Sequence, residues 1–551
     1  MTSPSDIRAI RAIRGRFLSY REGCRSDRRV AGPTEGSRAP WFLLTAGLIG
    51  LIALFQFLQW PLLPRFLDVY YHLGVAQGFD QAGGYVSHAF WECAPAGRPQ
   101  LYPPLLHVLL LGAHRLGLDW ISVGRLAEAI MFPAFLAALA CAVTVFGSAT
   151  AGFFATLVAS SIFPLYLEAG ILLPFTLAVT LGLLAAAALR RSRLVTAAIL
   201  LGLALHAHLL MGAIALVAIV LYGAAVPGQR PRVLRVAAAA LLMAAPLLIH
   251  VARHAASFAV VRVRESRTLE IDPLTFLLAL AGLTIALRRR GALLLPVAFW
   301  LAALPLAFTH PVRFAGGLGL VGPVWLAGVA LAEAWGWAER RSPSRRAARL
   351  LVPLVMLLFL AVTPMLHVNV PARSVRLRFF DRTVTHYLLP ESWRTVRPKE
   401  ATVYVPEAYA RLAEIVRAKA APDEAIWSDF AQGAGILSLL TGRPTSSAMM
   451  LEVRPSKPFD PIAAARVTVL FKSAALDSAA IAAALAERHR LQPAGETDLA
   501  YVLINPAPVP RLRVPPPTIP LAGILATGFL AVAFVMLDIR RRTPDDPVGG
   551  R

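Results

Sequence analysis

The sequence predicts a polytopic α-helical membrane protein with a small α/β domain before its last span. Three observations favour this fold class. Hydrophobic residues make up 57% of the 551 residues and charged residues only 16%, whereas about a quarter of a soluble globular protein is charged. The apolar residues come in runs of about twenty, the length that a helix needs to cross a bilayer. Short arginine blocks separate these runs, a pattern typical of membrane topology. A soluble enzyme, a disordered chain and a coiled coil are therefore excluded.

The apolar runs predict about twelve spans, which leaves both termini on the same side. A shorter run at 104–118 contains His107, His114 and Arg115, so we expect it to form a helix lying along the membrane interface. The spans are expected near 41–63, 127–147, 149–167, 171–189, 194–206, 208–226, 233–250, 273–287, 292–309, 315–335, 350–367 and 518–539.

The arginine distribution predicts the orientation. The segments on one side contain 27 arginines, and the short segments on the other side contain 9. Because cytoplasmic loops carry the excess of positive charge, the side with 27 arginines is expected to be the cytoplasmic one. If 104–118 were a span, every later arginine block would lie outside. The inside segments are 1–40, 190–193, 227–235, 288–291, 340–349 and 540–551, and the outside segments are 64–126, 168–170, 251–272 and 310–314.

The net charge of +23 and the three cysteines bear on nucleic-acid binding and on disulfide formation. In a soluble protein, such a charge would suggest a nucleic-acid partner. Here the arginines lie between spans, so no nucleic-acid partner is expected. Cys24, Cys93 and Cys141 fall inside, outside and within the membrane, which argues against an intrachain disulfide. The outer segment 251–272 contains four arginines together with acidic residues. We expect it to be either a solvated loop with internal ion pairs or a contact for the phosphate of a lipid-linked substrate.

One sizeable water-soluble region is predicted, on the outer side. Short apolar stretches alternate there with amphipathic ones, a pattern that predicts a small α/β domain. The apolar stretches are 402–405, 424–428, 466–471 and 499–504, and the amphipathic ones are 407–419 and 478–490. The predicted organisation is a cytoplasmic basic tail (1–40), a transmembrane domain (41–367) with a long outer loop (64–126), an outer α/β domain (368–516), a last span (517–539) and a cytoplasmic tail (540–551).

The first outer loop carries the most informative motif. It reads Asp68-Val-Tyr-Tyr-His-Leu73, followed by Pro95-Ala-Gly97 and by Leu101-Tyr-Pro-Pro-Leu-Leu-His107. A carboxylate and aromatic rings at a membrane surface are ordinary by themselves. The combined pattern resembles the first outer loop of the GT-C membrane glycosyltransferases. Within that superfamily it most resembles the catalytic subunits of oligosaccharyltransferases and their bacterial relatives.

The resemblance implies a fold and a chemistry. GT-C enzymes take sugars from lipid-phosphate donors, and their hallmarks are an acidic residue in the first outer loop and an acidic motif in the next. Asp68 matches the first, and Glu168 in Phe163-Pro-Leu-Tyr-Leu-Glu168 matches the second, although the family's fuller version is a pair of acids. Asp68 and Glu168 are therefore the expected catalytic residues. With water, these two carboxylates could also hold Mg²⁺ or Mn²⁺ beside a phosphate.

Basic and aromatic residues complete the predicted site. Arg313 resembles the family's arginine that neutralises the phosphate leaving group, and its alternative role is an interfacial anchor. His206 and His208 lie at the outer end of a span, where ionisable groups are costly. They are expected to contact a metal or the donor phosphate, or to be ordinary interfacial histidines. Tyr71 and His72, beside Asp68, are also assigned to the donor phosphate.

The predicted α/β domain contains a weaker similarity. Trp427 and Asp429 resemble part of the W-W-D-Y-G motif with which oligosaccharyltransferases recognise the acceptor sequon, but Ser428 stands between them. Because of this departure, sequon recognition is not carried over. The simpler interpretation of the segment is the end of a strand that turns into a helix.

The sequence thus predicts an inverting glycosyltransferase that moves a sugar from a polyprenyl phosphate or diphosphate to a glycan, lipid or protein acceptor. Asp68 would be the general base or would orient the acceptor, Glu168 would position a metal or the donor phosphate, and Arg313 would stabilise the leaving phosphate. The site would face the extracytoplasmic side of an inner or plasma membrane, among membrane lipids. No P-loop, GxSxG, HExxH or Rossmann fingerprint occurs, so no nucleotide cofactor is expected.

Three alternatives stay open. The first is an oligosaccharyltransferase that acts on protein asparagine, which the region 427–429 fits poorly. The second is a lipid-glycan transporter or flippase, which would need polar groups at the midplane and broken helices in two related halves. The third is a structural scaffold, which would not need Asp68, Glu168 and Arg313 on one face.

Overall fold

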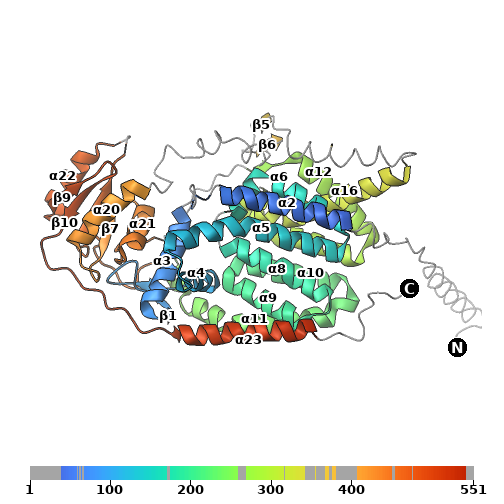
Figure 1. The fold of residues 1–551 in the computed structure, drawn as a ribbon, viewed down its shortest axis with the longest axis horizontal. Helices are drawn as coiled ribbons and strands as arrows, with labels where there is room; N and C mark the ends of the chain where they lie inside the picture. Colours follow the sequence, from blue (N-terminus) through green and yellow to red (C-terminus); the bar gives the residue numbers. More distant parts are fainter. Residues whose placement is uncertain are drawn as a thin grey trace, which may run out of the picture.

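The structure is a computed structural model in which a bundle of apolar helices carries an α/β unit at one end (Figure 1). It describes residues 39–58, 60, 64, 67–170, 174–258, 269–315, 317–341, 354, 366–370, 375–379, 406–449, 453–473 and 476–540.

The long helices follow the predicted apolar runs. The first, α2, is Ala39–Leu58, and the last, α23, is Leu521–Arg540. Between them lie α5 (Trp120–Phe146), α6 (Ala149–Ser161), α8 (Pro174–Arg190), α9 (Leu194–Ala207), α10 (Leu209–Ala225), α11 (Arg230–Arg253), α12 (Pro273–Arg289), α13 (Leu294–Ala303) and α16 (Val321–Arg341). Shorter helices are α3 (Leu67–Ala82), α4 (Leu105–Arg115), α7 (Phe163–Gly170), α14 (Leu306–Thr309), α15 (Pro311–Ala315) and the 3₁₀ turn η6 (Leu318–Leu320).

The predicted count of about twelve spans stays a prediction. Within the described residues, 6 helices are long and apolar enough to cross a membrane, and α7 with α8 would make a seventh span that is bent by 96°. The helices α4, α6, α9 and α10 are apolar but shorter. Most of the span predicted at 350–367 lies outside the described residues.

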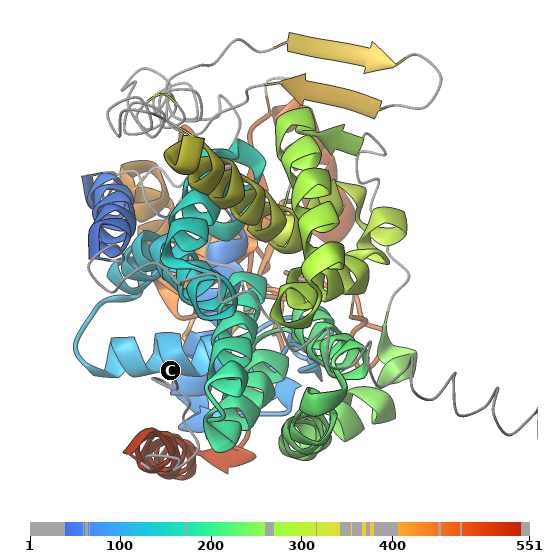
Figure 2. The ribbon, with the colours of Figure 1, turned by 90° about the vertical axis from the view of Figure 1, so that its right-hand side faces the viewer.

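Helices at the edge of the bundle expose apolar side chains, as lipid contact requires. None of the residues of α23 is buried, and Figure 2 shows this helix at the periphery. Leu43 on α2 is 73% exposed and Phe529 on α23 is 77% exposed. By contrast, almost every residue of α6 is buried. Exposed apolar surface on this scale is costly in water but suits the hydrocarbon of a bilayer.

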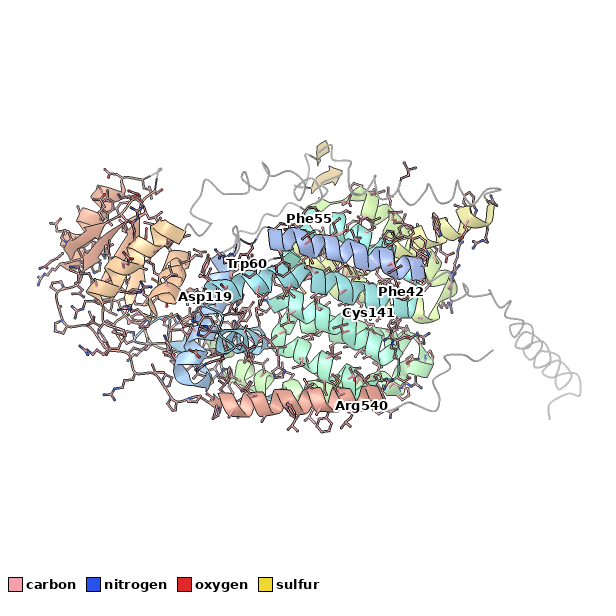
Figure 3. All side chains as sticks on the ribbon, viewed as in Figure 1. Phe42, Phe55, Trp60, Asp119, Cys141 and Arg540 are labelled. Atoms are coloured by element: carbon pink, nitrogen blue, oxygen red, sulfur yellow. The ribbon has the colours of Figure 1, made fainter. Side chains whose placement is uncertain are left out.

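One end of the bundle gathers segments that the arginine count assigns to the inside. Arg193 donates hydrogen bonds to the carbonyls of Asp538 and Ile539, and Thr196 donates to the Asp538 carboxylate through its amide (2.9 Å) and its hydroxyl (2.8 Å). Arg232 donates to the hydroxyl of Ser192 at 3.1 Å, which brings the next predicted inside loop to the same place. In Figure 3, Phe42 and Arg540 lie toward this end, while Trp60 and Asp119 lie toward the other.

The opposite end gathers predicted outer segments. Strand β1 (Gly84–Tyr85) pairs antiparallel with β11 (Ile519–Pro520), immediately before the last helix. His250, near the end of α11, contacts the carbonyl of Gln100 at 3.0 Å. Strand β4 (Leu269–Ile271) pairs in parallel with β6 (Val375–Phe379), which pairs antiparallel with β5 (Leu366–Val370). The two ends therefore group the loops as the alternation of spans requires.

The α/β unit contains a four-stranded sheet of order β7-β8-β10-β9. The strands are β7 (Ile426–Ser428), β8 (Val467–Phe471), β9 (Gln492–Glu496) and β10 (Ala500–Ile504), and only the β7–β8 pair is parallel. The helices are α20 (Pro406–Lys419), α21 (Ala431–Thr441) and α22 (Ser478–His489). The strands predicted near 424–428, 466–471 and 499–504 and both predicted amphipathic helices are confirmed. The helix α21 agrees with the expected strand end that turns into a helix, whereas β9 was not predicted and 402–405 lies outside the described residues.

The first outer loop extends this sheet. The amide of Thr445 donates to the carbonyl of Trp91 at 2.8 Å, and the amide of Ala94 donates back to Thr445 at 3.0 Å. The amide of Cys93 donates to Ser447 at 3.2 Å, and Thr445 also forms a parallel bridge to β7. The loop and the α/β unit thus share one hydrogen-bonded layer instead of meeting across a linker.

They also share a hydrophobic core. Val69, Tyr70 and Leu73 on α3 pack in one buried cluster with Leu412 and Ile436 of the α/β unit. Since α3 carries the predicted catalytic carboxylate, the α/β unit fixes the position of the helix on which that carboxylate lies. The sequence did not indicate this shared core.

A buried ion pair also stabilises the junction between the first outer loop and the α/β unit. The Nη2 atom of Arg98 lies 2.5 Å from Oε1 of Glu92, and these side chains are 1% and 0% exposed. Oε2 of Glu92 accepts from the amide of Met449 at 3.0 Å, and Arg98 donates to the carbonyl of Val453 at 3.3 Å. The pair therefore links the first outer loop to the segment that precedes β8.

Candidate functional site

Helix α3 presents three of the predicted site residues on one face. Asp68 is exposed in the first turn, where a negative charge is favourable beside the helix N-terminus. Tyr71 and His72 follow at spacings of three and four residues, which in a helix places them next to Asp68 on the same face. The spacing of the motif Asp-Val-Tyr-Tyr-His thus places its aspartate, second tyrosine and histidine on one face of the helix.

The buried part of this surface is a cluster of histidine and tyrosine rings. The Nδ1 atom of His72 lies 3.0 Å from Nε2 of His107 on α4, and both residues are buried. The ring of Tyr102 lies 5.3 Å from that of His72 and 6.0 Å from that of Tyr71, measured between centroids. On its other side Tyr102 lies 6.1 Å from His208, which connects the first outer loop to the end of α9.

The environment keeps this pair of histidines neutral. Burial lowers the pKa of His72 well below its usual value, and the neighbouring His107 and His208 lower it further. Burial likewise lowers the pKa of His107 to about 3, against the opposing effect of the Pro103 carbonyl. Desolvation disfavours the charged imidazolium, so both rings are uncharged at neutral pH.

Glu168 and Arg313 form the charged part of the site. The Nε atom of Arg313 on α15 lies 3.6 Å from Oε1 of Glu168 on α7, and these side chains are 35% and 13% exposed. The amide of Leu318, at the start of η6, donates to Oε2 of Glu168 at 2.6 Å. This approach requires glycine at 317, because a Cβ atom there would overlap the Glu168 carboxylate.

One aromatic ring connects the charged part to the histidine cluster. The guanidinium of Arg313 lies over Phe175 at 5.4 Å from the ring centroid. Phe175 in turn lies 6.1 Å from the ring of His208. The row Glu168, Arg313, Phe175 and His208 therefore continues through Tyr102 to the face of α3.

Most of the predicted site residues meet in this row. The structure brings Tyr71, His72, His208, Glu168 and Arg313 together at one end of the bundle, and it places Asp68 one helical turn from His72.

The other predicted residues have local partners. His206 contacts the carbonyl of Gly202 within α9 at 3.0 Å. Trp427 lies within β7, and Asp429 accepts from the amide of Phe471 at 3.0 Å, which ties the end of β7 to the end of β8. This arrangement matches the interpretation of a strand that turns into a helix.

A metal held by several protein groups does not fit the described residues. They contain no group of three or more histidine, cysteine, aspartate or glutamate side chains placed to hold an ion. The Glu168 carboxylate faces a guanidinium and a backbone amide, both of which compete with a cation for its oxygens. The predicted Mg²⁺ or Mn²⁺ between Asp68 and Glu168 stays a prediction.

The sequence interpretation missed four residues that shape the site. His107 and Tyr102 belong to the quoted motif, and two histidines in one outer loop were a signal that the motif itself offered. Gly317 follows Arg313 closely, in a Gly-Gly pair that marks a close backbone approach. Phe175 had no signal, because one more phenylalanine at the start of an apolar run is unremarkable in a sequence.

Comparison with known proteins supports the fold through structure alone. No family profile matches the sequence, and no curated protein matches it. The oligosaccharyltransferase of Archaeoglobus fulgidus in complex with Zn and sulfate is similar at 12% identity and a TM-score of 0.52, over 82% of this chain and 73% of that one. In its apo form the same enzyme is matched over 64% of its length.

ArnT from Cupriavidus metallidurans is similar over nearly its whole length. Its structure bound to undecaprenyl phosphate is 13% identical, with a TM-score of 0.51 over 85% of this chain and 98% of that one. The apo structure gives the same coverage at 16% identity. At these identities the likeness shows the fold alone, which this chain shares with ArnT and with the archaeal oligosaccharyltransferase.

Proposed function

We propose that this protein is a membrane glycosyltransferase that transfers a sugar from a polyprenyl-phosphate-linked donor to an acceptor on the outer face of the membrane, with inversion. The observation that carries the proposal is the partly exposed Glu168–Arg313 pair, which lies within a GT-C fold at the same end of the bundle as Asp68. The ArnT structure with undecaprenyl phosphate supports a polyprenyl carrier.

Arg313 binds the phosphate of the donor. Its ion pair with Glu168 is long, at 3.6 Å, and a third of the side chain is exposed, so the guanidinium can bind a phosphate oxygen without leaving Glu168. Negative charge grows on this phosphate as the sugar departs. A cation that is already in place stabilises the charge without reorganisation, which is the usual source of the largest rate effect. Glu168, held by the Leu318 amide, keeps the guanidinium in position.

Asp68 activates or orients the acceptor. Its carboxylate accepts the proton of the acceptor's nucleophile while the bond from that atom to the anomeric carbon forms. The bond from the anomeric carbon to the phosphate oxygen breaks, and the phosphate keeps the electron pair. A single displacement of this kind inverts the anomeric centre. No step requires a metal, although a divalent cation beside Asp68 would add charge stabilisation.

The orientation and location follow the same proposal. One side of the predicted topology carries 27 arginines and the other carries 9, which favours a cytoplasmic position for the side with 27. The site then faces the extracytoplasmic side of an inner or plasma membrane, where lipid-linked sugars replace nucleotide sugars as donors. Acceptors of this site are a glycan, a lipid or a protein.

A second candidate is transfer of a whole glycan to protein asparagine, which the likeness to the archaeal oligosaccharyltransferase favours. The local partners of Asp429 argue against it, since they give that residue a role within the sheet. An asparagine-containing acceptor peptide added to the assay below separates the two activities.

The test is donor turnover by purified protein in lipid nanodiscs, with a panel of polyprenyl-linked sugars and with or without Mn²⁺. We expect the Asp68→Asn variant to lose turnover. A matched control on the same helix is Asp80→Asn, whose carboxylate is paired with Arg115 at 2.6 Å and should be dispensable. Full transfer by Asp68→Asn would contradict the proposal.

A further inference from the structure

Three segments that are far apart in the sequence meet beside the end of α11. The amide of Arg454 donates at 2.8 Å to the carbonyl of Ser257, in the loop that follows α11. The amide of Ser456 donates to the carbonyl of Gly97 in the first outer loop, also at 2.8 Å. Two residues of chain span at most about 7 Å. The segment that contains Arg454 therefore holds the loop after α11 next to the first outer loop.

Two exposed arginines lie at this meeting point without an acidic partner. Arg253 is the last residue of α11, and it belongs to the outer segment 251–272, whose other arginines lie outside the described residues. Arg454 is bound to the loop after α11 at Ser257. Within the described part of the chain, neither arginine side chain forms an ion pair or a hydrogen bond. Because like charges repel each other, an anion bound between them would stabilise both.

Two histidines beside Arg253 can add hydrogen bonds to such an anion. Nε2 of His250 donates to the carbonyl of Gln100 at 3.0 Å, and Nδ1 of His254 donates to the carbonyl of His250 at 3.0 Å. A carbonyl oxygen only accepts, so the bonded nitrogen of each ring carries a proton and the other nitrogen stays available. The two rings are partly exposed, and their centroids lie 4.7 Å apart. The available nitrogen can bind a proton and then donate to an anion.

The lipid-facing side of α11 leads to Arg253. Leu242 is 77% exposed and Ile249 is 51% exposed, on a helix that is long and apolar enough to cross a membrane. Arg253 follows Ile249 by four residues and Leu242 by eleven, which places all three on one face of the helix. It lies about 6 Å beyond Ile249 along the helix axis, where the hydrocarbon gives way to the lipid headgroups. A phospholipid phosphate is therefore within reach of the Arg253 guanidinium.

We propose that Arg253, Arg454 and His254 form a binding site for the phosphate group of an anionic phospholipid, in the leaflet that surrounds this end of the bundle. The guanidinium groups bind the phosphate oxygens, and protonated His254 adds a further hydrogen bond. A zwitterionic headgroup also brings an ammonium group, which the two arginines repel. The bound phosphate fastens the first outer loop to the end of α11. This site depends neither on the transfer reaction nor on the donor contact proposed for Arg313.

The two histidine rings can report on binding at this site. Protein labelled with nitrogen-15 at histidine is titrated in neutral detergent with short-chain phosphatidylglycerol, short-chain phosphatidylcholine or inorganic phosphate. The NMR signals that are lost in His250→Gln and His254→Gln identify the two rings. We expect phosphatidylglycerol to shift both signals saturably, and to bind at least about tenfold more tightly than phosphatidylcholine or inorganic phosphate, which lacks acyl chains. No shift, or an equal affinity for either of the other two probes, would overturn the inference.

Two variants and one control test the arginines. Arg253→Gln and Arg454→Gln should each weaken the binding of phosphatidylglycerol about tenfold, the effect of losing one hydrogen bond between charged groups. The matched control is Arg235→Gln at the opposite end of α11, where Nε of Arg235 donates to the Pro231 carbonyl at 3.2 Å. This control should leave the affinity within about twofold of the wild type. An unchanged affinity in Arg253→Gln or Arg454→Gln, or an equal loss in the control, would overturn the inference.

Discussion

Two glutamate–arginine pairs in this protein share their chemistry and differ in their surroundings. Glu92 and Arg98 are 0% and 1% exposed and 2.5 Å apart, and backbone groups of the α/β unit bind both side chains. Glu168 and Arg313 are 13% and 35% exposed and 3.6 Å apart. Both pairs lie in segments that the sequence assigns to the outer side.

The difference indicates what each pair can do. Removing one member of a fully buried pair leaves an uncompensated charge, so Glu92 and Arg98 hold two regions of the chain together. A loose, partly exposed pair keeps part of its cation accessible to an anion. The first pair therefore stabilises the junction that positions α3, and the second supplies charge to the proposed reaction.

The largest effect is expected from breaking the buried pair. The Arg98→Met variant leaves the Glu92 carboxylate buried without its cation, which costs about 3–5 kcal/mol of stability. Thermal unfolding in detergent and the yield of monodisperse protein measure this loss. The matched control is Arg115→Met, because Arg115 is 53% exposed in its pair with Asp80 and its loss should cost at most about 1 kcal/mol. Equal stability of both variants would contradict a structural role for Arg98.

Breaking the partly exposed Glu168–Arg313 pair should affect turnover instead. We expect Arg313→Gln to reduce transfer about 10²–10³-fold, the range found when one preorganised electrostatic group is removed. Its unfolding temperature should stay close to that of the wild type, since Arg313 is partly solvated. A loss of stability as large as that of Arg98→Met would assign Arg313 a structural role.

The position of Glu168 can be perturbed without changing its charge. A Cβ atom at 317 would overlap the Glu168 carboxylate, so Gly317→Ala should displace it from the Leu318 amide. We expect transfer to fall by up to about 10²-fold, as small misplacements near a reacting centre can do. The control is Gly112→Ala on α4, where nothing lies within 4 Å of an added Cβ atom. Unchanged turnover in Gly317→Ala would show that the Leu318 contact is dispensable.

The last expected effect concerns pH. The pKa values of His72 and His107 are lowered by burial, so below pH about 6.5 the unfolded chain binds protons that the folded chain does not. Stability should therefore fall as the pH decreases from about 6.5, by at most about 1.4 kcal/mol per pH unit for each histidine, until the folded-state pKa is reached. Unfolding temperatures between pH 7 and pH 5 measure the slope, and His107→Gln should reduce it. An identical slope in that variant would contradict a buried neutral His107.

The sequence predicted the elements whose signals are local. The last span at 518–539 appears as α23, and the apolar stretch at 466–471 appears as β8, because apolar length and alternation are properties of neighbouring residues. Glu168 and Arg313 were predicted on one face because the alternation of spans puts their loops on the same side. Their direct contact depends on packing that alternation does not describe.

The rest depends on contacts between distant residues. Nothing near Trp91 or Thr445 indicates that the first outer loop extends the sheet of the α/β unit. The side of α3 that packs on α21 is likewise set by a partner more than three hundred residues away, as the hydrogen bond from Gln77 to the Leu439 carbonyl illustrates. His107 received no role because periodicity does not show which ring it meets.

The central claim is that the Glu92–Arg98 pair is structural and that the Glu168–Arg313 pair takes part in the reaction. The amount of sugar transferred per folded molecule tests this claim most directly. Turnover of a polyprenyl-linked sugar is measured for Arg98→Met and Arg313→Gln and divided by the amount of folded protein in each sample. The expected result is near wild-type turnover for the folded fraction of Arg98→Met and a loss of about 10²-fold or more for Arg313→Gln. Equal turnover per folded molecule in the two variants would contradict the claim.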